Sequence, residues 1–307
     1  MRKKIRMLIL WVVLSTLTVV SIMISEKNNC QIGTILASAL TTILIERVWQ
    51  AGQDIFNTTN WQTSQTKLKR GGFIKDNTII RISFSYLYRI KVENKYLLIQ
   101  NSRNTGKYQP VGGVYKFQGN ERQELKNLFH IMDDDKIPID ESSHNDYRLR
   151  IENRYLRKFV SRFNSKKAER ERIDNTGREF REELVKTGIL NWDRISYRYC
   201  GRYITDLKFE EHFQIYEMLL IDVIELLPTP DQENDLKNLM GQDKGLCCFA
   251  TADQITCLGT NVNNKNLNEW IGDHTKITLQ ENETKLMKMP GVGKTYEVLL
   301  DVENHNS

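Results

Sequence analysis

The sequence predicts a transmembrane helical hairpin at its amino terminus, followed by an α+β domain in which helices flank a mixed sheet. Two apolar runs near the first residue predict the hairpin. Beyond them, apolar residues recur at every second position, as in a β-strand, and other segments have helical spacing. The predicted parts are the hairpin at 1–48, a juxtamembrane linker at 49–72 and a cytosolic domain at 73–303.

Charge is distributed unevenly along the 307 residues. Residues 1–48 contain six Lys and Arg against two Glu, whereas the rest of the chain contains 38 basic and 37 acidic residues. Such a balance argues against a broad nucleic-acid surface, so no DNA or RNA partner is predicted. The five cysteines have neither a zinc-site spacing nor a disulfide framework, which predicts reduced thiols and no structural metal.

The first apolar run, at 7–24, holds eighteen residues without a charge, enough for a membrane-spanning helix. A cleaved signal peptide is the alternative, because the run follows a basic start. No small-x-small cleavage site follows it, however, and a second apolar run begins after five residues. The second run, at 30–45, is about 24 Å long as a helix, so it crosses the hydrocarbon only with local thinning or help from flanking residues.

The flanks of the two runs predict their orientation. Four basic residues precede the first run, and the connecting loop carries Lys27 alone, so the positive-inside rule keeps both termini in the cytoplasm. In the second run Gly33, Ala37 and Thr41 recur at four-residue spacing, which lets helices approach closely in lipid. The stripe packs either within one hairpin or between the hairpins of different molecules.

The domain begins after a polar, irregular linker that ends at Gly71 and Gly72. At 80–92 apolar and polar residues alternate, which predicts a half-buried antiparallel strand or two strands joined by a bend. Another strand is predicted at 95–101. The charged stretch at about 119–175 is interpreted as a large insertion with helical portions.

A helix is predicted at 178–188, where Glu179, Glu182 and Glu183 share one face. Like charges at this spacing repel by about 0.2–0.5 kcal/mol per pair. One interpretation is that Arg178 and Lys186, each four residues from Glu182, screen the acids. The other is that the three carboxylates bind a cation.

The segments at 96–116 and 177–190 together resemble the nudix domain. The turn at Gly112 and Gly113 and the helix Arg-Glu-Phe-Arg-Glu-Glu from Arg178 resemble the family motif, which implies a nudix-like fold. The resemblance implies that Glu179, Glu182 and Glu183 hold Mg²⁺ if the domain is a hydrolase.

Two features depart from the nudix motif. Counting back eight residues from Arg178 for the family's first glutamate lands on Arg170, between Glu169 and Glu171. Four residues, rather than one, separate Glu183 from Gly188. A damaged metal site of this kind implies a pocket that binds a phosphorylated ligand without cutting it, so no catalytic residue is assigned.

Two transmembrane helices followed by an enlarged nudix-like domain resemble the membrane effectors of bacterial cyclic-oligonucleotide antiphage systems (CBASS), of the SMODS-associated nudix type. The resemblance implies an inner-membrane protein whose domain senses a cyclic di- or trinucleotide. Binding then makes hairpins assemble into homo-oligomers, disrupts the membrane and kills the infected cell.

Six residues are expected to contact the cyclic nucleotide: Arg103, Lys107 and Lys116 through phosphates, Gly112 and Gly113 through amides, and Tyr108 through a base. Base stacking is one interpretation of Tyr108, Tyr197 and Tyr199, and burial in the sheet is the other. The five histidines have no metal or triad spacing and are assigned no chemistry.

Two other functions remain open. One is a membrane-tethered, Mg²⁺-dependent nudix hydrolase of a nucleoside diphosphate derivative, in which local folding brings Glu169 or Glu171 into the place of the missing carboxylate. The other is an anchored scaffold without a small ligand.

Overall fold

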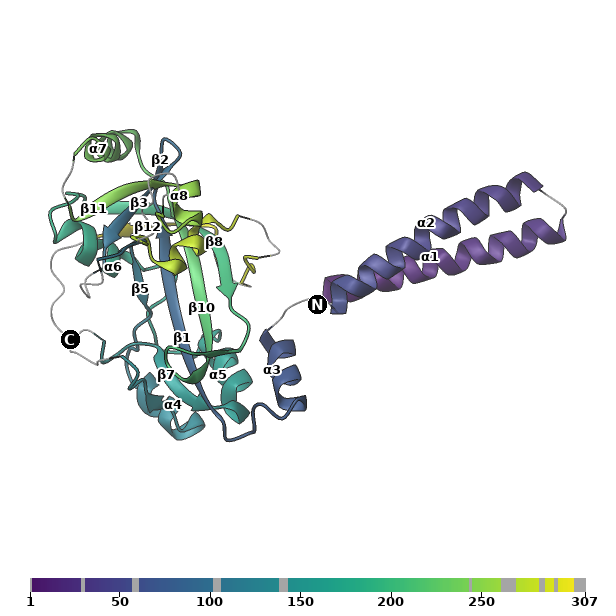
Figure 1. Ribbon diagram of the computed structural model, residues 1–307, viewed down its shortest axis with the longest axis horizontal. Coiled ribbons are helices and arrows are strands. Elements are labelled where there is room, and N and C mark those ends of the chain that lie inside the picture. Colours follow the sequence, from purple (N-terminus) through teal and green to yellow (C-terminus); the bar gives the residue numbers. More distant parts are fainter. Residues whose placement is uncertain are drawn as a thin grey trace. The chain divides into compact units, whose positions relative to one another are not determined.

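The computed structural model describes residues 2–28, 31–56, 61–101, 106–137, 143–242, 245–260, 269–281, 285–289 and 292–300. The chain divides into two compact units, Met1–Lys67 and Leu68–Ser307. Figure 1 shows the helical hairpin of the first unit and the sheet-containing second unit. Each unit is described by itself.

The first unit is a pair of helices, α1 (Arg2–Lys27) and α2 (Gln31–Phe56), that pack against each other. Both are long and apolar enough to cross a membrane, over Arg6–Lys27 and Gln31–Val48, which indicates membrane association. Most of their large apolar side chains are exposed in the unit. A lipid phase would cover such side chains at no cost in hydrophobic free energy.

The predicted small-residue stripe lies inside the hairpin. Ala37 and Thr41 are each 8% exposed, and Gly33 is half-buried on the same face of α2. In a two-helix unit this face is the one toward α1. The stripe therefore packs within the hairpin, and contact between hairpins through these residues would require α1 and α2 to separate.

The linker predicted to be irregular at 49–72 is largely helical in the described residues. Helix α2 continues to Phe56, and α3 spans Trp61–Arg70. In α3, Trp61 and Gln65 are both buried and lie one turn apart. This i, i+4 spacing gives the segment a buried face, which its polar composition concealed.

Among the described residues, eight strands form the main sheet of the second unit, in the order β12-β8-β10-β1-β7-β6, with β5 paired to β1 and β9 to β10. They are β1 (Ile79–Arg89), β5 (Gly112–Val114), β6 (Met132–Asp133), β7 (Arg148–Glu152), β8 (Arg194–Ile204), β9 (Lys208–Glu210), β10 (Ile215–Leu226) and β12 (Thr295–Leu299). The central pair, β1 and β10, is parallel and the other pairs are antiparallel. The predicted mixed sheet is confirmed.

Strand β1 is buried on both faces, so the predicted half-burial was wrong for this segment. The alternative of two strands is confirmed, because β1 ends at Arg89 and β2 (Lys91–Val92) follows it. Its polar residues are paired inside the domain instead of facing solvent. Arg81 forms ion pairs with Asp134 and Glu217. Arg89 donates to the carbonyls of Thr278 and Gln280, both at 2.6 Å. Alternating polar residues therefore indicate a solvent-facing side of a strand only when no oppositely charged or hydrogen-bonding group is buried beside them.

A second sheet of four strands has the order β11-β3-β2, with β4 paired to β3. The strands are β2 (Lys91–Val92), β3 (Lys95–Gln100), β4 (Tyr108–Gln109) and β11 (Cys247–Thr251). Helix α8 (Ala252–Thr256) follows β11 directly, and Thr251 and Gln254 form a capping box at its start. The described cysteines, Cys200, Cys247, Cys248 and Cys257, are free thiols.

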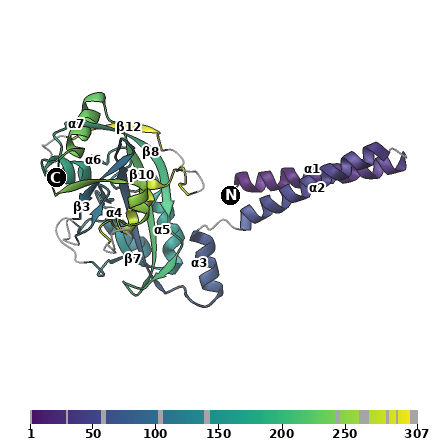
Figure 2. The same ribbon diagram turned by 45° about the horizontal axis from the view of Figure 1, so that its top comes forward.

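The remaining helices are α4 (Glu121–Phe129), η1 (Asn153–Tyr155), α5 (Leu156–Phe163), α6 (Gly177–Phe180), η2 (Arg181–Val185), α7 (Pro230–Met240) and η3 (Asp273–Leu279). In Figure 1 α4 and α5 lie beside β7, and in both views α7 lies at the opposite end of the domain from β7 (Figure 1, Figure 2). Phe163 of α5 stacks on Phe84 of β1, with ring centroids 3.8 Å apart. The segment predicted to be an insertion contains α4, α5 and β7, and β7 pairs with β1.

Candidate functional site

A cleft of about 450 Å³ lies on one face of β1. Because side chains alternate across a strand, Arg81, Ser83, Ser85 and Leu87 share this face, whereas Phe84 packs against α5 on the other. Arg81 and Leu87 are six positions apart, so the floor is about 20 Å long at about 3.3 Å per residue. The volume is typical of sites for small ligands.

The glycines of β5 form a wall of the cleft. Glycine is required at both positions because a larger residue would collide with its neighbours. A Cβ atom at Gly112 would overlap the carbonyl oxygen of Tyr86, and one at Gly113 would overlap the carboxylate of Glu179. The amide of Gly112 donates to Glu183 Oε2 at 3.0 Å. The predicted Gly-Gly turn and the predicted glutamate helix therefore meet, although about 65 residues separate them in the sequence.

Helix α6 and its continuation η2 place two glutamates, Glu179 and Glu183, beside this wall. Phe180 anchors the helix, with its ring 5.5 Å from that of Tyr88 and 5.7 Å from that of Trp192. Glu179 and Glu183, four residues apart, both line the cleft. η2 is a π-helical segment, whose wider turn accommodates the longer spacing between Glu183 and Gly188.

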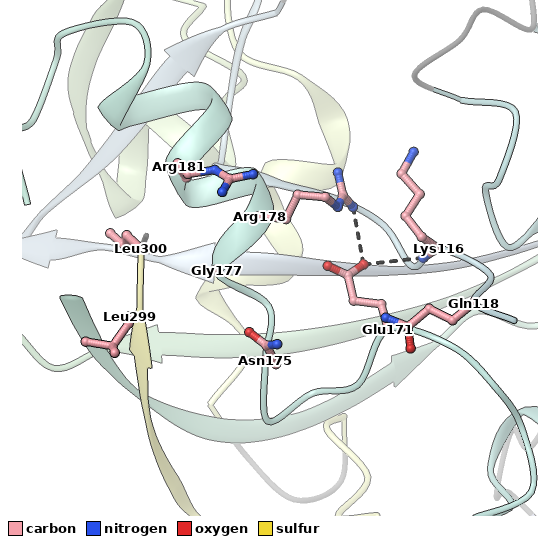
Figure 3. A pocket seen from close by; sticks show the side chains of 9 residues that line it. All are labelled: Lys116, Gln118, Glu171, Asn175, Gly177, Arg178, Arg181, Leu299 and Leu300. Carbon is pink, nitrogen blue, oxygen red and sulfur yellow. Dashed lines mark hydrogen bonds and ion pairs between the residues drawn. The ribbon is translucent and has the colours of Figure 1, made fainter. Parts of the chain in front are cut away.

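Glu171 provides the buried carboxylate that the motif spacing did not place (Figure 3). Its Oε2 accepts from Arg178 Nη2 at 3.2 Å and from the amide of Lys116 at 3.3 Å. Arg170 forms an antiparallel β-bridge with Phe117. In such extended backbone the side chains of successive residues, here Arg170 and Glu171, point to opposite sides. The count along the sequence thus lands on Arg170, which stacks on Phe163 at 3.7 Å. Glu171, the next residue, faces Arg178.

Glu182 does not join the other two predicted metal ligands. Its side chain is 41% exposed and lies 3.4 Å from Arg178, as the screening interpretation predicts. Arg178 also binds Glu179, at 2.6 Å. Within the described ranges no group of three His, Cys, Asp or Glu side chains is arranged to hold a metal ion. As placed, the carboxylates do not fit a three-glutamate Mg²⁺ site.

Burial changes the protonation of the two glutamates in the cleft. The pKa of Glu183 is raised to about 8, chiefly by burial and then by the charge of Glu179. Burial also raises the pKa of Glu179, against the opposing effect of Arg178. Near pH 7 most Glu183 carboxyls are therefore protonated, and the cleft repels an anionic ligand less than its acid count indicates.

The opposite end of the cleft carries three cations, Arg81, Lys116 and Arg148. Three acids alternate with them, namely Asp134, Asp146 and Glu217. Arg148, for example, lies 3.4 Å from Asp134 and 3.2 Å from Asp146. This end is electrically balanced and held in place by its own ion pairs.

The residues predicted to bind the ligand divide into three groups. Gly112, Gly113 and Lys116 line the cleft, although the Gly112 amide that was predicted to contact a ligand donates to Glu183. Arg103 lies outside the described residues. Lys107 and Tyr108 face elsewhere: the Lys107 ammonium pairs with Glu269 at 2.9 Å, and Tyr108 Oη donates to the Gly245 carbonyl at 2.7 Å.

Alternation along β4 explains this error, because Gln109, the residue after Tyr108, is the one that lines the cleft. Tyr108 packs instead against the small core of the second sheet. Tyr197 is buried, and Tyr199 Oη donates to Asp222 at 2.9 Å, so burial in the sheet is the interpretation that holds for both.

His274 of η3 also lines the cleft, together with Asn101 at the end of β3. Neither residue belongs to a recognisable motif, and about 170 residues separate them. No spacing in the sequence could have joined them to the glycines and glutamates.

A second pocket, of about 460 Å³, shares Lys116 with the cleft (Figure 3). Arg178, Glu171 and the side chains of Leu299 and Leu300 line it. The contacts of Glu171 with Arg178 and with the Lys116 amide fix the start of α6 beside this pocket.

The family model described as the SMODS-associated NUDIX domain matches residues 79–279. Among solved structures, a crystal structure of a UDP-X diphosphatase is similar with a TM-score of 0.23 and 11% identity, covering 90% of this chain and 93% of that chain. A score of this size carries no argument about function. Comparison with curated proteins gave no match.

Proposed function

This chain belongs to the SMODS-associated NUDIX family, and we propose that its nudix-like domain binds a cyclic oligonucleotide second messenger in the β1 cleft. The family links the chain to CBASS-associated nudix proteins. The proposed role is that of a CBASS effector, which converts messenger binding into disruption of the bacterial inner membrane and death of the infected cell.

The meeting of Gly112, Gly113, Glu179 and Glu183 in one cleft is the observation that carries the proposal. A floor about 20 Å long gives room for more than one nucleotide unit. The protonated Glu183 lowers the repulsion of phosphates, and at the other end the acids are balanced by Arg81, Lys116 and Arg148. These features support binding of an extended, anionic ligand.

The hairpin is the proposed output of the switch. Both termini would lie in the cytoplasm, and messenger binding would bring subunits together so that their hairpins assemble in the bilayer. Shifting a two-state equilibrium from 1:99 to 99:1 takes about 5.5 kcal/mol of differential binding energy. Assembly of several subunits would divide this requirement among them.

We prefer binding without cleavage over hydrolysis for two reasons. Glu182 does not line the cleft, and the Glu179 carboxylate is already in an ion pair with Arg178. The second candidate, a Mg²⁺-dependent hydrolase of a nucleoside diphosphate derivative, is favoured by the two crowded glutamates alone. It requires a different arrangement of these side chains.

Calorimetric titration of the full-length protein in lipid nanodiscs, with a panel of cyclic di- and trinucleotides, tests the proposal. At least one ligand is expected to bind with micromolar affinity or better. In Gly113→Ala the new Cβ overlaps the Glu179 carboxylate, which must shift within the cleft wall, so binding should weaken about tenfold or more. Gly241→Ala is the matched control, since its Cβ meets only the Asn238 carbonyl oxygen, at an ordinary 3.5 Å.

Two results would count against messenger sensing. If no cyclic nucleotide binds or stabilises the protein, the anchored scaffold is the better description. If Mg²⁺-dependent turnover of nucleoside diphosphate derivatives appears and is lost in Glu183→Gln, the domain is a hydrolase.

A further inference from the structure

Three uncharged polar side chains gather at the Leu87 end of the cleft. Asn101, Gln109 and His274 all line it, beyond the Gly112 wall and away from the ion pairs at the Arg81 end. They come from the end of β3, from β4 and from η3. Uncharged polar side chains are suited to hydrogen bonds with a neutral group.

The carboxamide of Gln109 has a fixed orientation. Its Oε1 accepts from Asn101 Nδ2 at 2.8 Å. This bond leaves the Nε2 amino group of Gln109 with no hydrogen-bond partner among the described residues. Gln109 is half-buried and lines the cleft, so this amino group is available as a hydrogen-bond donor there.

His274 is placed beside this amide by backbone contacts. The Gly272 amide donates to the Tyr108 carbonyl at 2.9 Å, which ties the start of η3 to β4. Arg89 holds the other end of η3 through the Thr278 carbonyl. Burial lowers the pKa of His274 against the opposing charge of Asp273, so the imidazole is neutral near pH 7. A neutral imidazole offers one donor and one acceptor.

We propose that this end of the cleft reads the base of the bound nucleotide and selects bases that present carbonyl oxygens, such as guanine, over adenine. The inference rests on the proposed function. Guanine presents O6 and N7 as acceptors, which match the amide donors of Gln109. Adenine presents an amino donor in place of O6, so the Gln109 amino group would face another donor there.

The test compares cyclic di-GMP and cyclic di-AMP as probes, titrated into the full-length protein in nanodiscs. The wild type is expected to bind cyclic di-GMP about tenfold tighter or more. Gln109→Glu keeps the size of the side chain but replaces the donor with an acceptor, so it should reduce or reverse the ratio. Gln109→Ala should weaken guanine binding without a gain for adenine. Gln123→Glu, on the exposed face of α4, adds the same charge elsewhere and should leave the ratio unchanged.

The outcomes separate the two proposals. If neither these probes nor any other cyclic nucleotide of the panel binds the wild type, the proposed function fails. If cyclic nucleotides bind but the wild type does not prefer guanine, or if Gln109→Glu leaves the ratio unchanged while its melting curve is normal, base reading by Gln109 is wrong and messenger binding stands.

Discussion

Glu183 holds its carboxyl between the amide of Gly112 and the charge of Glu179. Its pKa of about 8 lies well above the value of about 4.5 for an unburied glutamate. The folded domain therefore retains a proton at a pH where the unfolded chain has released it. The stability that this proton provides is fully present below the unfolded pKa and is lost as the pH rises through the folded pKa.

Replacing Glu183 by Gln should remove much of this pH dependence. Without divalent cations, the melting temperature of the wild type is expected to fall between about pH 4.5 and pH 8 as Glu183 is forced to ionise. Glu183→Gln should match the wild type near pH 5 and be more stable near pH 9. Thermal unfolding across this range measures the difference, and parallel curves for the two proteins would contradict the raised pKa.

Single residues also show where prediction from the sequence ended. Glu179, Glu183, Gly112 and Gly113 were predicted together because a motif specifies their order. The motif count missed Glu171 by one position. In an extended segment the direction of a side chain depends on strand pairing, which cannot be read from the sequence. Gln109 and His274 have no motif, and only tertiary folding brings them to the cleft.

At the level of elements, the alternation of apolar and polar residues predicted strands but not their distant partners. The strand pattern at 80–92 predicted β1 but not its burial on both faces, because Arg81 pairs with Asp134, more than fifty residues away. The segment at 119–175 was predicted as a large insertion with helical portions, and the sequence did not show that its strand β7 pairs directly with β1. Partners at such separation cannot be read from local composition.

The ion pair between α4 and α5 gives a test of how firmly this segment is attached. Glu121 is fully buried and accepts from Arg162 at 2.6 Å, Tyr147 at 2.8 Å and the Glu169 amide at 3.0 Å. Glu121→Ala leaves these donors without their acceptor, so the free energy of unfolding should fall by about 3–5 kcal/mol.

Glu124 on the same helix is the matched control for Glu121. It also lies 2.6 Å from Arg162, but its side chain is 53% exposed. Glu124→Ala should cost about 1 kcal/mol or less. Urea unfolding measures both values. Equal losses in the two variants would show that burial does not strengthen the Glu121 pair.

At the level of the whole molecule, two units have separate physical requirements. The hairpin exposes apolar side chains that a lipid phase would cover, whereas the domain buries its own core and contains the cleft. The order of these units was predicted from hydropathy and strand periodicity alone. The proposed coupling between a ligand in one unit and the other unit was not predictable from the sequence, because the proposal depends on an assembly of several chains.

Dye release from sealed liposomes that contain the full-length protein tests this coupling most directly. A cyclic nucleotide that binds the protein should release the dye, and Gly113→Ala should need about a tenfold higher ligand concentration for the same rate. Gly241→Ala should behave as the wild type. Liposomes that stay sealed while the ligand is bound, or that leak equally without it, would contradict control of the membrane hairpin by the cleft.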